Sequence, residues 1–170
     1  MTSIRIERVA DYAFVIACVA VVALVLQRQM PGLQTRPQLL GPGEIISTVP
    51  GVSFGAARRT ALLVVNQSCK FCALSMPFYK QLSDRRKGGD TSFQFAAMSP
   101  QDDDETVKKY LAEHDVTVDR GLHLALTRVT DVGTPALLVV DSQGRVVASW
   151  LGLLSGAQQQ EVDAALRSGG

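Results

Sequence analysis

Polar and apolar residues follow two different periods from about residue 45 to the end of the chain. Apolar runs of four to eight residues predict strands, and apolar positions three and four residues apart predict helices. The expected order is therefore strand, helix, strand, helix, hairpin and helix, over residues 61–66, 71–86, 92–98, 102–114, 135–140 with 145–151, and 155–167. The segment before them, 45–54, is expected to be a weak strand or a loop. This order is typical of an α/β domain on a mixed sheet.

A different apolar stretch lies near the N-terminus. Residues 9–26 are apolar except for Asp11, and as a helix they would span about 27 Å, close to the ~30 Å hydrocarbon core of a bilayer. Residues 27–30, Gln-Arg-Gln-Met, offer no small-residue cleavage pattern, so an anchor over residues 1–27 is favoured over a cleaved signal peptide. Cys18 loosely resembles a lipid-attachment site, but the eight apolar residues after it favour an ordinary membrane-facing side chain.

Residues 28–44 contain repeated prolines and glycines and have no hydrophobic period. Such a composition predicts a tether, partly stiffened by its prolines. The remaining residues, 45–170, are then one folded domain. The net charge of +1 gives no electrostatic case for binding nucleic acid.

Two cysteines, Cys69 and Cys72, lie where the predicted strand 61–66 passes into the predicted helix 71–86. A pair with this spacing at a strand-to-helix junction is a redox signature. The first sulfur faces the unpaired N–H groups and the positive dipole end of the helix, which favour a thiolate. The second lies one turn further along, close enough to attack a mixed disulfide on the first. The pattern predicts an exchange dithiol.

A zinc site is the main alternative for such a pair, but a structural zinc ion needs four ligands. The other candidates are Cys18, His114 and His123, which form no pair in the sequence. The acidic run 102–105 is interpreted as the favourable charge of a helix N-terminus rather than a cation site. No metal site is predicted.

Further features agree with the cysteine pair. Pro77 lies five residues after Cys72, inside the predicted helix, and Gly133-Thr134-Pro135 opens the next strong strand. Together these motifs resemble the thioredoxin fold, whose members carry a helix-kinking proline and a cis-proline at these places. Residues 105–111 and 139–147 are similar to the membrane-anchored TlpA/ResA-like branch of thiol–disulfide oxidoreductases.

The resemblance covers about residues 45–168 and implies a thioredoxin-like three-layer α/β/α sandwich with a mixed central sheet. It also implies disulfide exchange with protein cysteines, without a metal or organic cofactor. In that chemistry the Cys69 thiolate attacks, a mixed disulfide forms, and Cys72 resolves it.

The resemblance also implies a substrate-binding surface beside the cysteines. A cis peptide before Pro135 would bring Thr134 next to them, where its backbone is free to pair with an extended client segment. Phe71, between the two cysteines, is expected to contact the client.

The sequence departs from the family pattern in two places. Ser68 stands where thioredoxins carry tryptophan, and Leu63 stands where they bury an acid that takes the proton of the second cysteine. That deprotonation is left unexplained. Lys70 adds a positive charge beside Cys69, so we expect a depressed Cys69 pKa and a more oxidising couple than in ordinary thioredoxin. Peroxiredoxins share the fold but carry threonine where Asn66 stands, which disfavours peroxidase activity.

The sequence therefore predicts a membrane-tethered thiol–disulfide oxidoreductase whose partners are protein thiols or disulfides and an unidentified redox protein. Because disulfides persist in oxidising compartments, we expect a single pass through a cytoplasmic (inner) membrane, with the domain on the periplasmic or another extracytoplasmic side. Reduction of apocytochrome cysteines in cytochrome c maturation is the expected family role. The alternative is a redox-inactive thioredoxin-fold module that only binds a partner protein.

Overall fold

The computed structural model describes residues 19, 21, 39–46, 49–123, 129 and 132–168. The chain divides into two compact units, Met1–Arg36 and Pro37–Gly170, and every named strand and helix belongs to the second. Within the described residues, no helix has the length and apolar content needed to cross a bilayer. The predicted anchor over residues 1–27 lies outside them apart from Val19 and Val21, and the predicted tether 28–44 is described only from residue 39.

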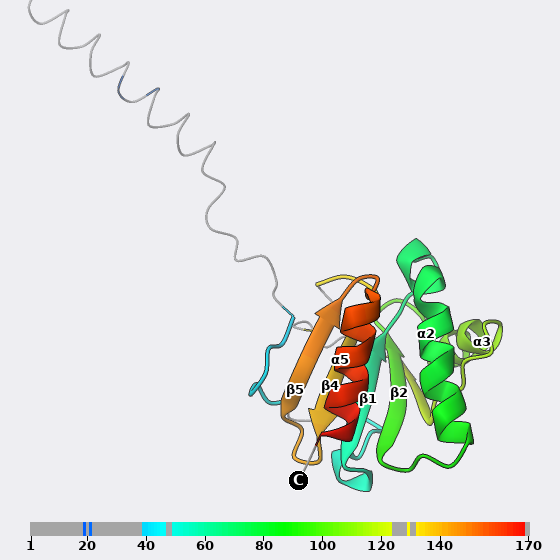
Figure 1. Cartoon of the computed structure of the whole chain (residues 1–170). Coiled ribbons are helices and arrows are strands. Elements are labelled where there is room, and N and C mark those ends of the chain that lie inside the picture. Colours follow the sequence, from blue (N-terminus) through cyan, green and yellow to red (C-terminus); the bar gives the residue numbers. More distant parts are fainter. Residues whose placement is uncertain are drawn as a thin grey trace, which may run out of the picture. The chain divides into compact units, whose positions relative to one another are not determined.

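The second unit is built on a five-stranded mixed sheet in the order β3-β2-β1-β4-β5 (Figure 1). The strands are β1 (Arg59–Val64), β2 (Phe93–Ser99), β3 (Arg120–His123), β4 (Ala136–Asp141) and β5 (Val146–Leu151). The first three are mutually parallel, whereas β4 runs antiparallel to both β1 and β5. β1 is therefore the central strand, and its carboxyl end lies beside that of β2.

The central strand is apolar at consecutive positions because both of its faces are covered. Leu62 and Leu63 point to opposite faces and are each 0% exposed. Leu62 belongs to one hydrophobic cluster and Leu63 to the other. The sheet thus separates two cores, which explains the uninterrupted apolar run in the sequence.

Three helices are described, with a short 3₁₀ turn, η1 (Phe54–Ala56), before β1. They are α2 (Lys70–Lys87), α3 (Asp104–Ala112) and α5 (Gly156–Arg167). The Asp103 carboxylate caps α3 by accepting the Thr106 N–H, and Ser155 caps α5 in a reciprocal box with Gln158. Figure 1 shows α2 and α5 lying across the same face of the sheet.

All three helices contribute to the cluster on the Leu63 face, with Met76 and Phe78 of α2 buried in it. The other cluster is closed by residues from the segment 40–54 and by Val129. Of the three predicted layers, the described residues therefore contain the sheet and one helical layer. On the second face of the sheet, the structure describes irregular chain, the short turn η1 and the single helical residue Val129.

The predicted strands and helices match the structure to within two residues at their ends. The described residues of the segment 45–54 form isolated bridges and part of η1, so the loop alternative is confirmed and no strand is found among them. The strand β3 was missed, because it has only four residues and two of them are charged or titratable, Arg120 and His123. Pairing with β2 determines this edge strand, since so short a segment has no usable period.

An arginine on α2 connects that helix to two other parts of the domain. Arg85 donates to Asp163 of α5 at 2.7 Å and to Asp90, in the turn before β2, at 2.8 Å. Asp90 also accepts from the side chain and backbone of Ser92. The hydrogen bond from the Ser92 hydroxyl has the largest effect on the pKa of Asp90, and the hydrogen bond from Arg85 acts in the same direction. Together they lower this pKa to about 2. The charged form of Asp90 thus stabilises the fold.

The variant Asp90→Asn is expected to lose about 1 kcal/mol of unfolding free energy at pH 7, because the carboxylate remains in contact with water. Because the pKa of Asp90 is lower in the folded than in the unfolded protein, its charge stabilises the fold at pH values above the unfolded pKa near 4. This contribution disappears as the pH falls towards 2. Urea unfolding at pH 7 and pH 3 should therefore show a smaller difference from wild type at pH 3. Asp84→Asn, which removes only an exposed pair with Lys80, is the control. An equal Asp90→Asn loss at both pH values would contradict this account.

Candidate active site

The two cysteines lie at the start of α2, as predicted, and form a disulfide with a Cα–Cα distance of 5.2 Å. Cys69 is the N-cap residue, and its sulfur accepts a hydrogen bond from the Cys72 N–H at 3.1 Å. Cys72 is 0% exposed, whereas Cys69 is only partly buried. The first sulfur is thus the accessible one, and a helix amide stabilises negative charge on it.

The loop before β4 lies directly against Cys69. Its Thr134–Pro135 peptide is cis, and the Thr134 carbonyl oxygen lies 3.3 Å from Cys69 Sγ. The Pro135 carbonyl accepts the Gly152 N–H at 2.7 Å, which joins this loop to the chain that follows β5. The segments around residues 69, 134 and 152 therefore meet, although they are far apart in the sequence.

The other predicted site residues lie on the first turn of α2. Lys70 is its first residue and is exposed, with Phe71 next to it and 56% exposed. Neither side chain is needed for the core. Their proposed roles, in tuning the thiol and contacting a client, remain predictions.

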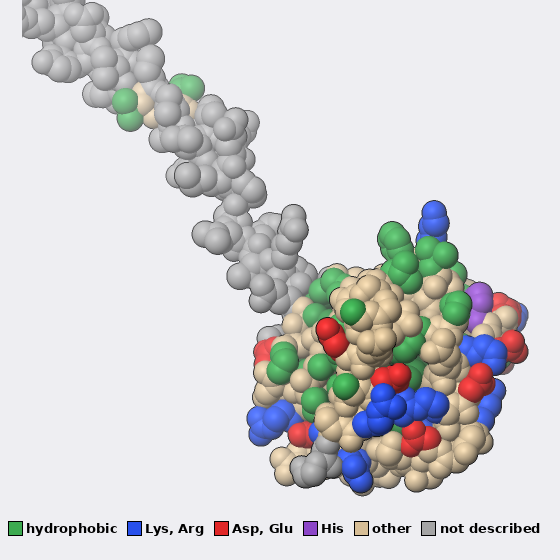
Figure 2. Space-filling model, in the orientation of Figure 1, with side chains coloured by type: hydrophobic (Ala, Val, Ile, Leu, Met, Phe, Trp, Pro, Cys, Tyr) green, Lys and Arg blue, Asp and Glu red, His purple; other side chains and the backbone are tan. Residues whose placement is uncertain are grey.

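Exposed apolar side chains gather around the cysteines. Those on α2 are Phe71 and Leu74, 56% and 52% exposed, and the one just after β5 is Leu153, 50% exposed. We call these three residues the apolar rim. Figure 2 shows apolar side chains protruding at the end of the domain where α2 begins. Of this group, only Phe71 is expected from the sequence to contact a client.

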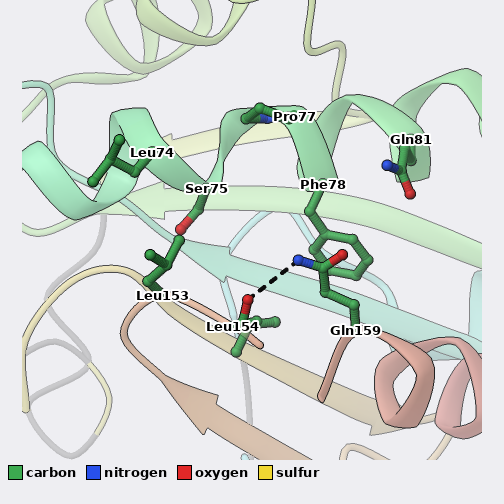
Figure 3. A pocket seen from close by; sticks show the side chains of 8 residues that line it. All are labelled: Leu74, Ser75, Pro77, Phe78, Gln81, Leu153, Leu154 and Gln159. Atoms are coloured by element: carbon green, nitrogen blue, oxygen red, sulfur yellow. Dashed lines mark hydrogen bonds between the residues drawn. The ribbon is translucent and has the colours of Figure 1, made fainter. Parts of the chain in front are cut away.

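A small cavity of about 100 Å³ lies between the two halves of the apolar rim (Figure 3). Its wall is uncharged and is formed by α2, the chain after β5 and α5, through Leu74, Ser75, Pro77, Phe78, Gln81, Leu153, Leu154 and Gln159. The Gln159 side chain donates to the Leu154 carbonyl at 3.2 Å, which holds this wall together. The cavity has room for one apolar side chain.

The two departures from the family pattern have clear structural positions. Leu63 is fully buried and belongs to the same hydrophobic cluster as Cys72, so no acid is supplied from its place in β1. Ser68 is exposed, and its N–H donates to the Asn66 side chain at 2.7 Å. The loop before Cys69 is thus held by polar contacts rather than by an aromatic side chain.

One buried acid near the cysteines was assigned wrongly from the sequence. Asp103 caps α3, and Asp104 and Glu105 lie in its first turn, as predicted for the acidic run. Asp102 instead is 9% exposed, and its carboxylate accepts hydrogen bonds from Gln67. The order of the strands could have indicated this contact between Asp102 and Gln67. β1 and β2 are parallel neighbours, so the residues that follow the two strands meet at the same edge of the sheet.

No protein-family model and no curated protein matches the sequence. Solved structures do match. One is the thioredoxin domain of a thiol–disulfide oxidoreductase from Bacteroides vulgatus, with 19% identity, a TM-score of 0.56, and coverage of 75% of this chain and 99% of that one. The chain has a thioredoxin fold.

Two further structures agree on this fold. A thiol–disulfide isomerase from Corynebacterium glutamicum is 16% identical, with a TM-score of 0.53 over 81% of this chain and all (100%) of that one. A secreted disulfide oxidoreductase from Mycobacterium tuberculosis, homologous to E. coli DsbE, is 15% identical, with a TM-score of 0.51 over 78% of this chain and 97% of that one. The thioredoxin fold accounts for the position of the cysteines and of the cis-proline loop.

Proposed function

We propose that the protein is a thiol–disulfide oxidoreductase that exchanges disulfides with cysteines of other proteins. The observation that carries this proposal is the accessible sulfur of Cys69, at the N-terminus of α2 and 3.3 Å from the Thr134 carbonyl. A helix amide stabilises the thiolate on one side, and on the other lies backbone suited to pairing with an extended client.

The proposed reaction is a two-electron exchange. The reduced Cys69 thiolate attacks one sulfur of a client disulfide, an S–S bond forms between them, and the other client sulfur leaves as a thiolate. Cys72 loses its proton and attacks Cys69 Sγ, which releases the second client thiolate. The protein ends as the Cys69–Cys72 disulfide and the client as a dithiol, and the reverse sequence oxidises a client dithiol.

The apolar rim supports a protein as the substrate. A small thiol needs only the sulfur, whereas an unfolded client segment carries apolar side chains that the rim and its cavity can bury. The expected client is therefore an extended segment with an uncharged apolar residue close to its cysteine. Phe71 would contact it beside the reacting sulfur.

The double variant Leu74→Ser with Leu153→Ser is expected to lower kcat/KM for insulin about 10-fold, mainly through KM, because two apolar contacts are lost. Its reaction with a small aromatic disulfide should change by less than about 2-fold. Stopped-flow measurement with both substrates distinguishes these effects. Ile45→Ser is the matched control, because Ile45 is 59% exposed but lies outside the rim. Equal losses with both substrates would contradict a docking role.

We further propose that residues 1–27 anchor the domain in the cytoplasmic membrane, with the domain on the periplasmic side. The apolar stretch 9–26 and the Pro/Gly-rich segment 28–44 support this arrangement. Reduction of apocytochrome cysteines before haem attachment is the role that the TlpA/ResA-like resemblance favours. Labelling a single engineered surface cysteine in intact cells with a membrane-impermeant reagent tests the topology.

The alternative function is a redox-inactive thioredoxin-fold module that only binds a partner. Leu63, at the position of the missing acid, favours it, because nothing at that point of β1 helps to deprotonate Cys72. Insulin reduction by the full-length chain with dithiothreitol separates the two functions. An oxidoreductase accelerates the reaction above dithiothreitol alone, whereas an inactive module leaves it unchanged.

A further inference from the structure

The buried carboxylate of Asp102 is directed at the loop that precedes Cys69. It accepts the Gln67 backbone N–H at 3.2 Å, the Gln67 side-chain amide at 3.1 Å and the Ser99 hydroxyl at 2.9 Å. The Ser99 hydroxyl in turn accepts the Asp102 N–H at 3.0 Å. Both carboxylate oxygens are therefore occupied, and the acid holds the ends of β1 and β2 together.

The rest of this loop is closed by Asn66. Its side-chain oxygen accepts the Ser68 N–H at 2.7 Å, and its carbonyl accepts the Cys69 N–H at 3.1 Å. Its side-chain amide donates to Gln101 at 2.6 Å, beside Asp102. Each backbone amide from residue 67 to residue 69 thus has an acceptor, and Asp102 supplies the first.

His123, at the end of β3, supports Asp102 from the other side. Its ring Nδ1 lies 2.8 Å from the Asp102 carbonyl, and because a carbonyl only accepts, this nitrogen carries the proton. The His123 backbone N–H donates to the Asp104 carboxylate. A chain of hydrogen bonds therefore runs from the edge strand through Asp102 to the residues that enter α2.

We propose that Asp102 is a positioning residue for disulfide exchange: it fixes the loop 66–68 and so holds Cys69 Sγ between the Cys72 N–H and the Thr134 carbonyl. The proposal rests on the proposed function. Without Asp102, the part-buried Gln67 N–H loses its acceptor, and the residues before Cys69 lose their fixed path. Displacements of about 1 Å at a reacting group can lower a rate up to about 100-fold.

Other charged or titratable groups lie close to this network. They include Lys109 and Tyr110 on α3 and Glu113 at its end, which line one hollow with Gln67. They also include His123 on β3, and Asp103 and Asp104 beside Asp102 in the chain. Burial, and then the charge of Asp102, raises the pKa of Tyr110, so the carboxylate is close to that ring as well. A test of Asp102 must therefore separate the loss of its hydrogen bonds from the loss of one negative charge.

The variant Asp102→Asn keeps the shape of the side chain but offers one oxygen and an NH₂ group, so a donor on Gln67 is left without an acceptor. In the full-length chain we expect insulin reduction to slow about 10-fold. We also expect the pH midpoint of Cys69 alkylation by iodoacetamide to rise by about half a unit or more, because the Cys72 N–H no longer holds the thiolate as firmly. Removing a nearby negative charge alone would move that midpoint downward.

Two further variants complete the test. Asp103→Asn removes the same charge from the next residue, whose carboxylate caps α3, and should leave the rate near wild type and not raise the midpoint. Ser99→Ala keeps the charge and removes both hydrogen bonds between the Ser99 hydroxyl and Asp102, so it should slow insulin reduction about 3-fold and also raise the midpoint. Ser99→Ala carries the test if Asp102→Asn does not fold.

The outcomes separate this inference from the proposed function. If wild type reduces insulin and the Asp102 and Ser99 variants match it in rate and in alkylation midpoint, Asp102 is not a positioning residue. A downward shift in the Asp102→Asn midpoint would also overturn the inference, because it would show a purely electrostatic effect. If wild type does not reduce insulin, the proposed function fails, and the alkylation midpoints still decide whether Asp102 positions Cys69.

Discussion

Replacing Cys69 by serine is expected to abolish insulin reduction by the full-length chain, with a loss of at least about 1,000-fold. The sulfur of Cys69 is the accessible one of the pair, and the Cys72 N–H and the Thr134 carbonyl both lie within hydrogen-bonding distance of it. A serine hydroxyl at the same place is not a useful nucleophile towards a disulfide, because its pKa is far above that of a thiol. Turbidity from precipitating insulin chains measures the rate.

The control for this substitution is Cys72→Ser, which keeps the attacking sulfur. It should also fail to turn over, but for another reason: Cys69 still attacks, and the mixed disulfide then persists because nothing resolves it. Activity that is unchanged in Cys69→Ser would rule out the proposed mechanism. A folded Cys69→Ser protein with a wild-type unfolding curve shows that the loss is chemical rather than structural.

The second large effect is expected in the core beneath the cysteines. Leu63 lies in the central strand β1, is 0% exposed, and shares a hydrophobic cluster with Cys72 and Met76. Leu63→Ala should lower the free energy of unfolding by about 3 kcal/mol, because it removes apolar contacts and leaves a cavity between the sheet and α2. Urea unfolding at pH 7 measures the loss.

Leu153→Ala is the matched control, since the same atoms are removed from a side chain that is 50% exposed. Its expected loss is below about 0.5 kcal/mol. If the two variants lost the same free energy, Leu63 would not be the packing residue that the structure describes.

The sequence was sufficient to predict most of the fold because its strongest patterns are local. The run around Leu62 and Leu63 is apolar on both faces, and α2 begins at a cysteine pair whose spacing has a chemical reason. The hairpin of β4 and β5 follows from its turn at Asp141 to Gly144, where Gly144 has a φ of +79° and its N–H donates to the Asp141 carbonyl. Each of these features is decided within about ten residues.

What the sequence did not predict depends on contacts between distant segments. The strand β3 exists because four residues pair with β2, and its own pattern is too short to indicate a strand. Asp102 was read with Asp103 as helix-capping charge, although it faces Gln67, which is 35 residues away in sequence. The apolar rim combines residues from α2 with Leu153 after β5, and an exposed leucine has no special meaning in a sequence taken alone.

The site residues named from the thioredoxin resemblance come together in the structure for a topological reason. β1 and β4 are antiparallel neighbours, so the end of β1 that leads to Cys69 lies beside the start of β4 that follows Pro135. Val64 pairs with Ala136 in that register, which sets the two loops next to each other. Sheet order thus converts two separate motifs into one candidate site.

The most direct test of exchange through Cys69 is covalent capture of a client. The Cys72→Ser protein, reduced and then incubated with a disulfide-containing unfolded protein, should form a one-to-one adduct that dithiothreitol releases. Peptide mapping by mass spectrometry should locate the bond at Cys69. If no adduct forms, or if the client is attached at Cys18 instead, the account of this protein as a Cys69-dependent oxidoreductase is contradicted.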